Sequence, residues 1–532
     1  MELNRAVTLW QKGDLAGAAG ACAELLAVQP DNVNALQLLG TIHMQQGALE
    51  KARSVLERAC SLAPNDVHVL NTLGLVHRRA GRLNDALPFF RKAVRLDPSL
   101  TAAYSNLGST LFDLRRPEEA RAAYRKLARL SPQYPEAWAQ LARLAELTHD
   151  SEDACRLAGR ALELNSADVT ANFVLARADL AEGRSENALD RLRPFAEDPG
   201  IPAVNRAIAH GLIGQALEAL GRFDAAFAAF GRANAELKTR FRSAFDAVVD
   251  PTKPEAVAAL RQDFAQIPSL DWPAGEYEGQ APVFLVGFPR SGTTLLDQIL
   301  ASHSQIATIE ERPVLLEMFG ELATSGSCAA RLAALNDDEI NGFRAAYWQA
   351  MAPYIDGASD AAVVVDKFPL NLVLLGVIAR VFPDAKIIFA LRDPRDVIMS
   401  CYQQRFGMNA AMYQFLELET AVAYYDQVMG LAGVYEERLA LPIHTVRYES
   451  VVAGLEAEIE PAVRFLGLEW EAGIADYRRT ARSRPIVTPS ASQVVRPLYA
   501  SAIGKWRNYE DQLAGHLTAL EKWVGRLGYG GG

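Results

Sequence analysis

The stretch PVFLVGFPRSGTTLLDQILASH, residues 282–303, joins three local patterns in a short space. An apolar run comes first, a loop bounded by Gly287 and Gly292 follows, and a helical period begins at Thr293. This order predicts a strand, a loop and a helix. Such a loop points backbone N–H groups and the N-terminus of a helix at an anion, so the stretch favours a phosphate-binding site in an α/β domain.

Side chains of this loop can add donors to those of the backbone. Arg290 would supply a charged donor, and Ser291, Thr293 and Thr294 would supply hydroxyls. The spacing of the two glycines matches the nucleoside-triphosphatase pattern G-x-x-x-x-G-K-[ST], but Thr293 stands where that pattern has lysine. Since that lysine reaches the terminal phosphates of a triphosphate, its absence argues against ordinary ATP or GTP hydrolysis and leaves room for a different 5′ group.

A second charged cluster follows the apolar run in AKIIFALRDPRDVIMSCYQQR, residues 385–405. The run is typical of a buried parallel strand, and open α/β sheets place their ligands at the carboxyl ends of such strands. If a helix begins near Pro394, Ser400 faces back toward Arg392, and the pair offers a charged fork and a hydroxyl to one phosphate. The alternative for either arginine of RDPRD is an ion pair with one of its aspartates.

Two further stretches carry groups suited to proton transfer and to charge stabilisation. In AAVVVDKFPLN a strand is predicted to end at Asp366, and Lys367 follows as a cation that can neutralise charge on a bridging oxygen and a leaving phosphate. IATIEERPVLLEM supplies Glu311, a carboxylate that can take the proton of an acceptor hydroxyl, with Glu310 as the alternative base. A surface lysine and a solvated first turn of a helix are the structural alternatives.

The motifs of the second half together resemble the tyrosylprotein sulfotransferase family. The string GFPRSGTT resembles the loop with which sulfotransferases bind the 5′-phosphosulfate of 3′-phosphoadenylyl sulfate (PAPS). The resemblance implies that residues 290–294 bind this group and that Arg392 and Ser400 grip the 3′-phosphate. It also makes Glu311 the catalytic base and Lys367 a stabiliser of the transition state, with adenosine 3′,5′-bisphosphate (PAP) as the product.

Later matches to the same family lie in HTVRYES and in TPSASQVVRPLYASAIGKWRNY. By resemblance, Tyr448 belongs to the adenosine site, Ser490 is a second stabiliser of the transition state, residues up to Tyr499 contact the nucleotide, and Lys505 is a phosphate ligand. No metal is expected. A sulfuryl group carries less charge than a phosphoryl group, so lysine and backbone dipoles can replace the magnesium that phosphoryl transfer uses.

The chain departs from the family at two places. Pro313 and Glu317 stand where the protein-sulfating members have arginines that grip an acidic peptide, and Gln404, followed by Arg405, replaces an arginine four residues after the phosphate-binding serine. The acceptor therefore stays open between a tyrosine in a protein, a carbohydrate hydroxyl and a small phenol.

The first half of the chain repeats with a period of 34 residues. Leucine followed by glycine or alanine recurs in one register, and alanines with larger residues four positions later recur in another, which indicates two packed helices in each repeat. Glycines fall at the turn between the helices. The pattern resembles tetratricopeptide repeats, with about seven units over residues 1–236, and the resemblance implies a groove that binds a peptide or protein. The period is marked by Pro30, Pro64, Pro98 and Pro132.

The predicted architecture is therefore an all-α superhelix followed by an α/β domain. Residues 237–281 are predicted to be a linker with a helix near 254–266. Residues 282–529 are predicted to form a three-layer α/β/α sulfotransferase domain around a parallel sheet. Its strands are expected near 283–287, 362–366, 385–391 and 443–447.

Composition sets further bounds. The chain has 532 residues, of which 50% are hydrophobic and 22% charged, so two or more globular units are expected. A net charge of -10 argues against binding to nucleic acid or to an anionic membrane. No secretory signal or long apolar span is seen, and the five cysteines form no CxxC pair, so we expect a cytoplasmic protein without a zinc site. Formation of a homo-oligomer stays open.

Two other functions compete with sulfuryl transfer. In a P-loop kinase or ATPase, Asp366 at the end of its strand would hold magnesium, although the missing P-loop lysine counts against this interpretation. In a non-catalytic repeat scaffold, the transferase domain would be degenerate. The joint presence of Arg290, Glu311, Lys367 and Arg392 counts against a degenerate site.

Overall fold

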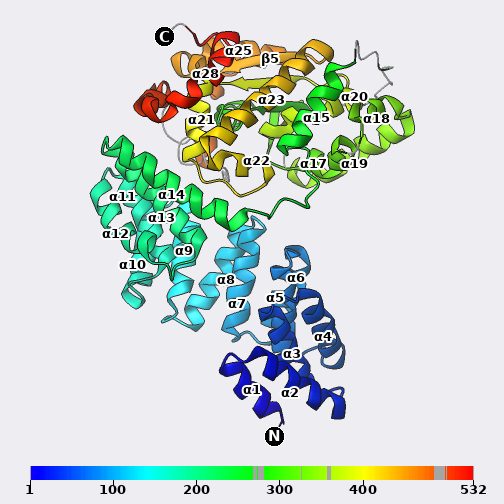
Figure 1. Cartoon of the computed structure of the whole chain (residues 1–532), viewed down its shortest axis with the longest axis vertical. Helices are drawn as coiled ribbons and strands as arrows, with labels where there is room; N and C mark the ends of the chain where they lie inside the picture. The colour runs from blue at the N-terminus through cyan, green and yellow to red at the C-terminus, as the bar shows by residue number, and fades with distance from the viewer. Residues whose placement is uncertain are drawn as a thin grey trace. The chain divides into compact units, whose positions relative to one another are not determined.

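The computed structural model of the chain describes residues 2–267, 272, 279, 281–324, 326–355, 361–483, 498 and 500–530. The chain forms two compact units, Met1–Ala178 and Asp179–Gly532 (Figure 1). Among the residues described, no helix combines the length and the apolar content that crossing a membrane requires.

The first unit, and the beginning of the second, consist of helices in sequential antiparallel pairs (Figure 1). This is the predicted repeat architecture, and the helices alternate with turns at the predicted spacing. The helices of the repeat region are α1 Glu2–Gln11, α2 Leu15–Val28, α3 Val33–Gln45, α4 Leu49–Leu62, α5 Val67–Arg79, α6 Leu83–Leu96, α7 Thr101–Asp113, α8 Pro117–Leu130, α9 Pro135–Leu147, α10 Ser151–Leu164, α11 Val169–Ala181, α12 Ser185–Glu197, α13 Ala203–Ala219 and α14 Phe223–Phe241.

The glycine that follows the repeated leucine lets two helices of a pair approach closely. A Cβ atom at Gly74 would lie 2.8 Å from the ring of Phe90, and one at Gly108 would lie 2.8 Å from the ring of Tyr124. The large side chain of the second helix thus occupies the space that the glycine of the first leaves open. This contact recurs at the repeat spacing. The repeated glycine of the first helix and the repeated large residue of the second helix therefore determine how each pair packs.

The second unit contains a parallel sheet of five strands in the order β2-β3-β1-β4-β5. Four of the strands lie where the sequence predicts them, and β2 was not predicted. Its sequence IATIE is short, and the glutamates at its end also suit the solvated first turn of a helix. The strands are β1 Val283–Gly287, β2 Ile306–Glu310, β3 Val363–Lys367, β4 Ile387–Leu391 and β5 Ile443–Arg447.

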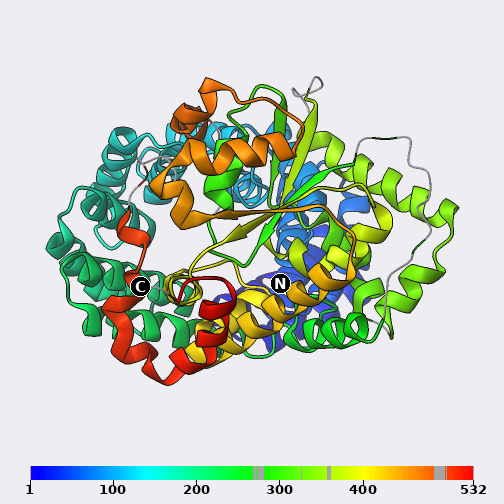
Figure 2. The same ribbon diagram turned by 90° about the horizontal axis from the view of Figure 1, so that it is seen from above.

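Helices cover both faces of this sheet (Figure 2). Alternate residues of β1 point to opposite layers, since Phe284 and Val286 lie in one core cluster while Val283 and Leu285 lie in the other. The predicted three-layer arrangement is therefore present. Further elements of the second unit are α15 Pro254–Ala265, α16 Thr293–Leu300, α17 Val314–Thr324, α18 Cys328–Ala334, α19 Asp337–Ile355, η1 Pro369–Leu374, α21 Pro394–Gln403, α23 Leu418–Arg438, α24 Tyr448–Ala453, α25 Leu455–Phe465, η4 Ala500–Ala502, η5 Lys505–Tyr509 and α28 Glu510–Arg526.

The helices next to the predicted linker belong to the larger core of the second unit. Leu260 and Phe264 of α15 are buried there, and so is Phe230 of α14. Gly376 accepts the ring of Phe264 so closely that a Cβ atom on it would lie 2.3 Å from that ring. Both α14 and α15 are thus packed into the α/β core.

Candidate active site

The loop after β1 requires glycine at both of its ends. A Cβ atom at Gly287 would lie 2.7 Å from the backbone oxygen of Ala390 on the adjacent strand β4. Gly292 has φ +94°, and a Cβ atom there would lie 2.9 Å from a ring carbon of Tyr448. Gly292 is also the residue that precedes α16, so the loop leads directly into a helix N-terminus. The loop therefore has the form of an anion cradle.

The hydroxyl residues of this loop are almost enclosed. Ser291, Thr293 and Thr294 are buried, and Arg290 takes a positive φ of 71° although it is not a glycine. A non-glycine residue in this region costs about 1–3 kcal/mol and persists only where its surroundings hold it. One such restraint is a hydrogen bond of 2.9 Å from Arg290 Nε to the hydroxyl of Ser400 on α21.

The loops after β1 and β4 meet beside one another at the carboxyl ends of these neighbouring strands. Arg392 Nη1 donates to the backbone oxygen of Arg290 at 3.3 Å. The chain leaves β1 toward one edge of the sheet and β4 toward the other, which is the switch point where open sheets bind ligands. Ser400 was predicted to face Arg392, but its hydroxyl accepts from Arg290. Arg290, Arg392 and Ser400 are nevertheless brought together.

Arg392 is a buried cation outside the ion pairs of the described residues. It is 7% exposed, Nη2 donates to the backbone oxygen of Ala502 at 2.5 Å, and the guanidinium lies 4.7 Å from the ring centre of Tyr448. Its Nε atom has no hydrogen-bond partner among the residues that the structure describes. Arg395, by contrast, forms an ion pair of 2.7 Å with Asp393. A buried cation with an unsatisfied donor is costly unless an anion meets it, so Arg392 suits a phosphate.

Asp396 connects the same helix to the C-terminal segment. Its two carboxylate oxygens accept from the backbone N–H groups of Gly504 at 2.7 Å and Trp506 at 2.9 Å. Burial raises the pKa of Asp396, and Arg392 opposes that change. No local sequence pattern indicates this role of Asp396, because its partners are backbone groups about a hundred positions away.

Lys367 and the adjacent glutamates form the second part of the site. Lys367 is fully buried, and its ammonium lies 2.9 Å from Glu311 Oε1 and 3.3 Å from Glu310 Oε1. Burial lowers the pKa of Lys367, but the charges of Glu311, Glu310 and Asp297 outweigh it and leave the pKa raised. The lysine is therefore a fixed cation. The pairing of β2 with β3 places Glu310 beside Lys367 and explains how the sequence segments meet.

Glu311 stands just beyond the end of β2 in a strained conformation. Its φ is +45°, and its backbone N–H donates to the oxygen of Lys367 at 2.8 Å. Its side chain is 35% exposed, whereas that of Glu310 is 14% exposed. Glu311 is thus the more accessible of the two carboxylates to a molecule that approaches from solvent.

Asp366, the neighbour of Lys367, points into the opposite layer. It is fully buried, and its Oδ2 accepts from Tyr347 at 3.1 Å and from Asn371 at 3.4 Å. Burial raises its pKa to about 7, although both hydrogen bonds and the charge of Lys367 act in the other direction. This carboxyl group is part of the core on the face of α19.

Of the remaining predicted site residues, the structure describes Tyr448 and Lys505. Tyr448 lies over Arg392 and beside Gly292, as described above, whereas Lys505 lies at the other end of α21 with its ammonium 3.0 Å from Gln403 Oε1. Ser490 and Tyr499 lie outside the described residues.

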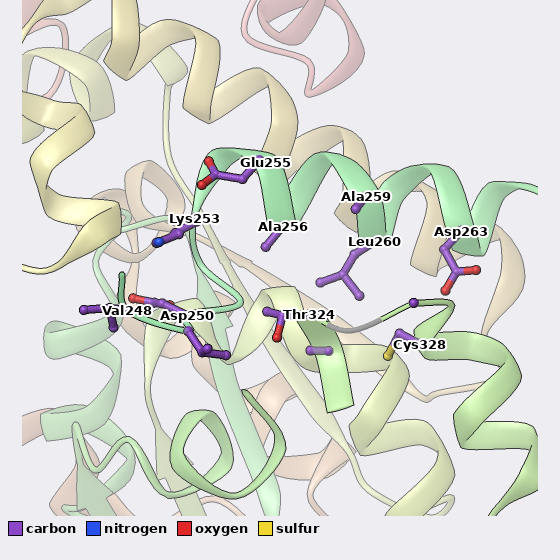
Figure 3. Close-up of a pocket in the computed structure, with 13 residues that line it drawn as sticks. Val248, Asp250, Lys253, Glu255, Ala256, Ala259, Leu260, Asp263, Thr324 and Cys328 are labelled. Atoms are coloured by element: carbon purple, nitrogen blue, oxygen red, sulfur yellow. The ribbon is translucent and has the colours of Figure 1, made fainter. Parts of the chain in front are cut away.

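The pocket in Figure 3 is separate from these residues. It lies between α15 and the chain around the end of α17, and Asp250, Lys253, Asp263 and Cys328 are among the side chains that line it. Some of its charged groups have partners within the protein. Asp263 accepts from Ser327 at 2.6 Å, for example, and Lys253 donates to the oxygen of Asp246 at 3.1 Å. The pocket contains none of the predicted site residues.

Comparison with known protein families matches both halves of the chain. The sulfotransferase family model matches residues 282–472, and the tetratricopeptide repeat model matches residues 3–67, 71–135 and 105–168. Solved structures similar to the repeats include the MamA protein, with 23% identity over 31% of this chain and 90% of that one at a TM-score of 0.29. A tetratricopeptide repeat protein of Parabacteroides merdae covers 44% of this chain at 18% identity, 91% of its own length and a TM-score of 0.37.

Curated relatives agree with these matches. An uncharacterized protein of Aquifex aeolicus is 26% identical over 407 residues, which are 73% of this chain and 51% of the relative, so the chain spans about half the length of that protein. Protein-tyrosine sulfotransferase 1 of Danio rerio is 26% identical over 46% of this chain and 72% of its own length. Nodulation protein NoeE of Sinorhizobium fredii is 29% identical over 36% of this chain and 51% of its own length.

Proposed function

The chain joins tetratricopeptide repeats to a domain of the sulfotransferase family, and we propose that it transfers a sulfuryl group from PAPS to an acceptor hydroxyl. The observation that carries this proposal is the buried Arg392, which contacts the glycine-bounded loop of Arg290 and whose Nε has no partner in the described part of the chain. These two arginines lie where a nucleotide with more than one anionic group would bind. PAP is the expected second product.

The residues at the end of β1 and β4 suit the donor's charges. Backbone N–H groups of residues 290–294 and the N-terminus of α16 would hold the 5′-phosphosulfate, and Arg392 with Ser400 would hold the 3′-phosphate. The ring of Tyr448, packed against Gly292 and Arg392, would border the adenosine. Ser490 and Lys505 keep their proposed roles as transition-state stabiliser and phosphate ligand.

The transfer step uses Glu311 and Lys367. As the acceptor oxygen bonds to sulfur, its proton passes to Glu311, and the bond from sulfur to the bridging phosphate oxygen breaks. Charge then grows on that oxygen, and the buried ammonium of Lys367 stabilises it. The ammonium of Lys367 lies 2.9 Å from Glu311 Oε1, so the proposed base and the proposed cation are close enough to act on one transferring group.

Asp366 is poorly placed for the competing kinase or ATPase mechanism. That mechanism needs an exposed carboxylate at the strand end, but Asp366 is fully buried and accepts hydrogen bonds from Tyr347 and Asn371 in the core. Together with Thr293 in the position of the P-loop lysine, this favours sulfuryl transfer.

For the acceptor and for the partner of the repeats, only the chemical class is proposed. Relatives named as protein-tyrosine sulfotransferases favour a tyrosine in a protein as the acceptor, whereas Pro313 and Glu317 weaken the case for an acidic peptide. The repeats are proposed to bind a protein or peptide. Carbohydrate and small phenolic hydroxyls are the alternatives for the acceptor.

Two measurements on the full chain test the proposed function. Titration calorimetry should show binding of PAP without magnesium, and PAPS carrying labelled sulfate should transfer the label to an acceptor in cell extract. Lys367→Met should retain PAP binding and lose transfer. Tight binding of ATP only with magnesium would contradict the proposal, and PAP binding without transfer to any acceptor pool would support the non-catalytic scaffold.

A further inference from the structure

One carboxylate of the last repeat-type helical pair reaches the nucleotide side of the α/β domain. Glu218, at the end of α13, forms an ion pair of 2.6 Å with Lys505. Its second oxygen accepts from Tyr509 at 2.7 Å and from Gln403 at 2.8 Å. The side chain of Glu218 is 21% exposed, so these bonds form in a partly shielded environment where they are stronger than at the surface.

The partners of Glu218 belong to elements already placed at the candidate donor site. Gln403 lies three residues after Ser400 on α21, which is about one helical turn along the same face. Lys505 begins η5, and Asp396 in the first turn of α21 holds the backbone on either side of it. Asp396 thus holds the backbone at the start of η5 against α21. Glu218 holds the side chains of Lys505 and Tyr509 of η5 next to Gln403 of α21.

The same helical pair also holds the residue before Gln403. The ring of Phe227 on α14 stacks on Tyr402 at 5.0 Å, and Asn234 Nδ2 donates to the backbone oxygen of Tyr402 at 3.0 Å. These uncharged contacts hold α14 against α21, so the packing of the two helices does not depend on Glu218. The role left for Glu218 is to orient the side chains of Lys505 and Gln403. A lysine ammonium has three N–H donors, and among the described residues Glu218 and Gln403 accept from two of them, so one remains for an anion.

We propose that Glu218 is a positioning residue for the nucleotide donor, because it fixes Lys505 and Gln403 beside the phosphate-binding end of the site. The pair α13–α14 is thereby part of the donor site as well as of the repeat region. This inference rests on the proposed function, since it requires that the donor carries a phosphate within reach of Lys505. Without Glu218, Lys505 must lose side-chain freedom when the donor binds, and affinity falls.

The first test compares wild type with Glu218→Gln in the full chain. Glutamine keeps the size of the side chain but removes its charge and one acceptor oxygen. We expect the Kd for PAP and the KM for PAPS to rise about tenfold, in keeping with the loss of one charge-assisted contact, while kcat changes less than about twofold. Equal or tighter PAP binding by Glu218→Gln would overturn the inference.

A double-mutant cycle separates positioning from a merely structural contact. Glu218→Gln should weaken PAP binding in the wild-type background but have no further effect in the Lys505→Met background, because its action passes through the lysine. If the two losses of affinity simply add, Glu218 does not act through Lys505. The thermal midpoints of all four proteins show whether any loss comes from unfolding.

Asp224→Asn is the matched control. Asp224 lies on α14 and accepts from Gln512 of α28 at 2.6 Å, so it also joins the helical pair to the α/β domain, but it bonds to no candidate donor residue in the described part of the chain. We expect its PAP affinity to equal that of wild type. Absence of PAP binding in the wild type would reject the proposed function itself, whereas binding that Glu218→Gln leaves unchanged would reject only this inference.

Discussion

At the scale of single residues, the site depends on two neighbours that face opposite ways. Alternation along β3 sends Asp366 into the core beside Tyr347 and sends Lys367 toward Glu311. Asp366 is therefore enclosed in the core, while Lys367 lies beside the proposed base. The strained backbone of Glu311, with φ +45°, is the cost of bringing a carboxylate from β2 to the same point.

The two adjacent glutamates should differ in their effect on transfer. Glu311→Gln removes the more accessible carboxylate and should lower kcat by about 10²–10⁴, the usual contribution of a general base, without changing the Kd for PAP. Glu310→Gln, the matched control, should lower kcat less than about tenfold. Labelled-sulfate transfer and calorimetry measure the two quantities. A larger loss in Glu310→Gln would assign the base to Glu310.

Asp366 should make stability depend on pH. Burial raises its pKa from 3.8 to about 7, so the folded protein holds a proton there that the unfolded chain releases at lower pH. Stability from this group therefore falls as pH rises from about 4 to about 7, and the full cost is about 4 kcal/mol.

Asp366→Asn, which cannot ionise, should remove this pH dependence. Its thermal midpoint should exceed that of wild type at pH 8, and the difference should be smaller at pH 5. Melting curves at both values measure it. The same difference at pH 5 and pH 8 would show that Asp366 does not titrate in this range.

At the scale of elements, the site is the meeting of two strand-loop-helix units. In the loop after β1, Arg290 donates to Ser400 of α21 and accepts from Arg392, which lies just before that helix. The two arginines of the RDPRD stretch are used differently, because Arg395 is neutralised by Asp393 while Arg392 is not paired with a carboxylate among the described residues. Of these two arginines, Arg392 is therefore the one left for the proposed phosphate.

Substitution of these two arginines should separate binding from stability. Arg392→Gln should raise the Kd for PAP by roughly 10–100-fold, since hydrogen bonds to charged groups contribute about 1.5–3 kcal/mol each. Arg395→Gln removes the bond of 2.7 Å to Asp393 and should lower the thermal midpoint while leaving the Kd nearly unchanged. Calorimetry and melting curves test both. Equal losses of PAP affinity in the two variants would contradict the assignment.

At the scale of the whole molecule, the repeat region and the compact units do not end at the same residue. The second unit begins at Asp179, and α13 and α14 therefore fold with the sheet. Phe230 of α14 lies in the core that holds α15, and Phe227 stacks on Tyr402. The last repeat-type pair thus has two roles, as an element of the periodic array and as a wall of the α/β unit.

Truncation should reveal this double role. A chain that starts at residue 242 lacks α13 and α14, so the apolar surface around Tyr402 becomes exposed and we expect aggregation or loss of PAP binding. A chain that starts at residue 179 keeps the whole second unit and should bind PAP. Solubility and calorimetry measure the outcome. Equal PAP affinity of the two truncated chains would show that α13 and α14 are dispensable for the site.

The sequence alone determined the classes of structure and the positions of most strands. Periodicity is a local property, so the 34-residue repeat predicted paired helices, and the apolar runs predicted β1, β3, β4 and β5. Loop motifs also predicted which strand ends carry charge. The candidate residues Arg290, Lys367 and Arg392 follow from such local patterns.

Only the tertiary structure decided how these residues are paired. The sequence does not show that Ser400 bonds to Arg290, that β2 brings Glu310 and Glu311 to Lys367, or that Glu218 reaches Lys505. The reason is that these contacts join segments between 56 and 287 positions apart, and their geometry depends on strand order and helix packing rather than on local propensity.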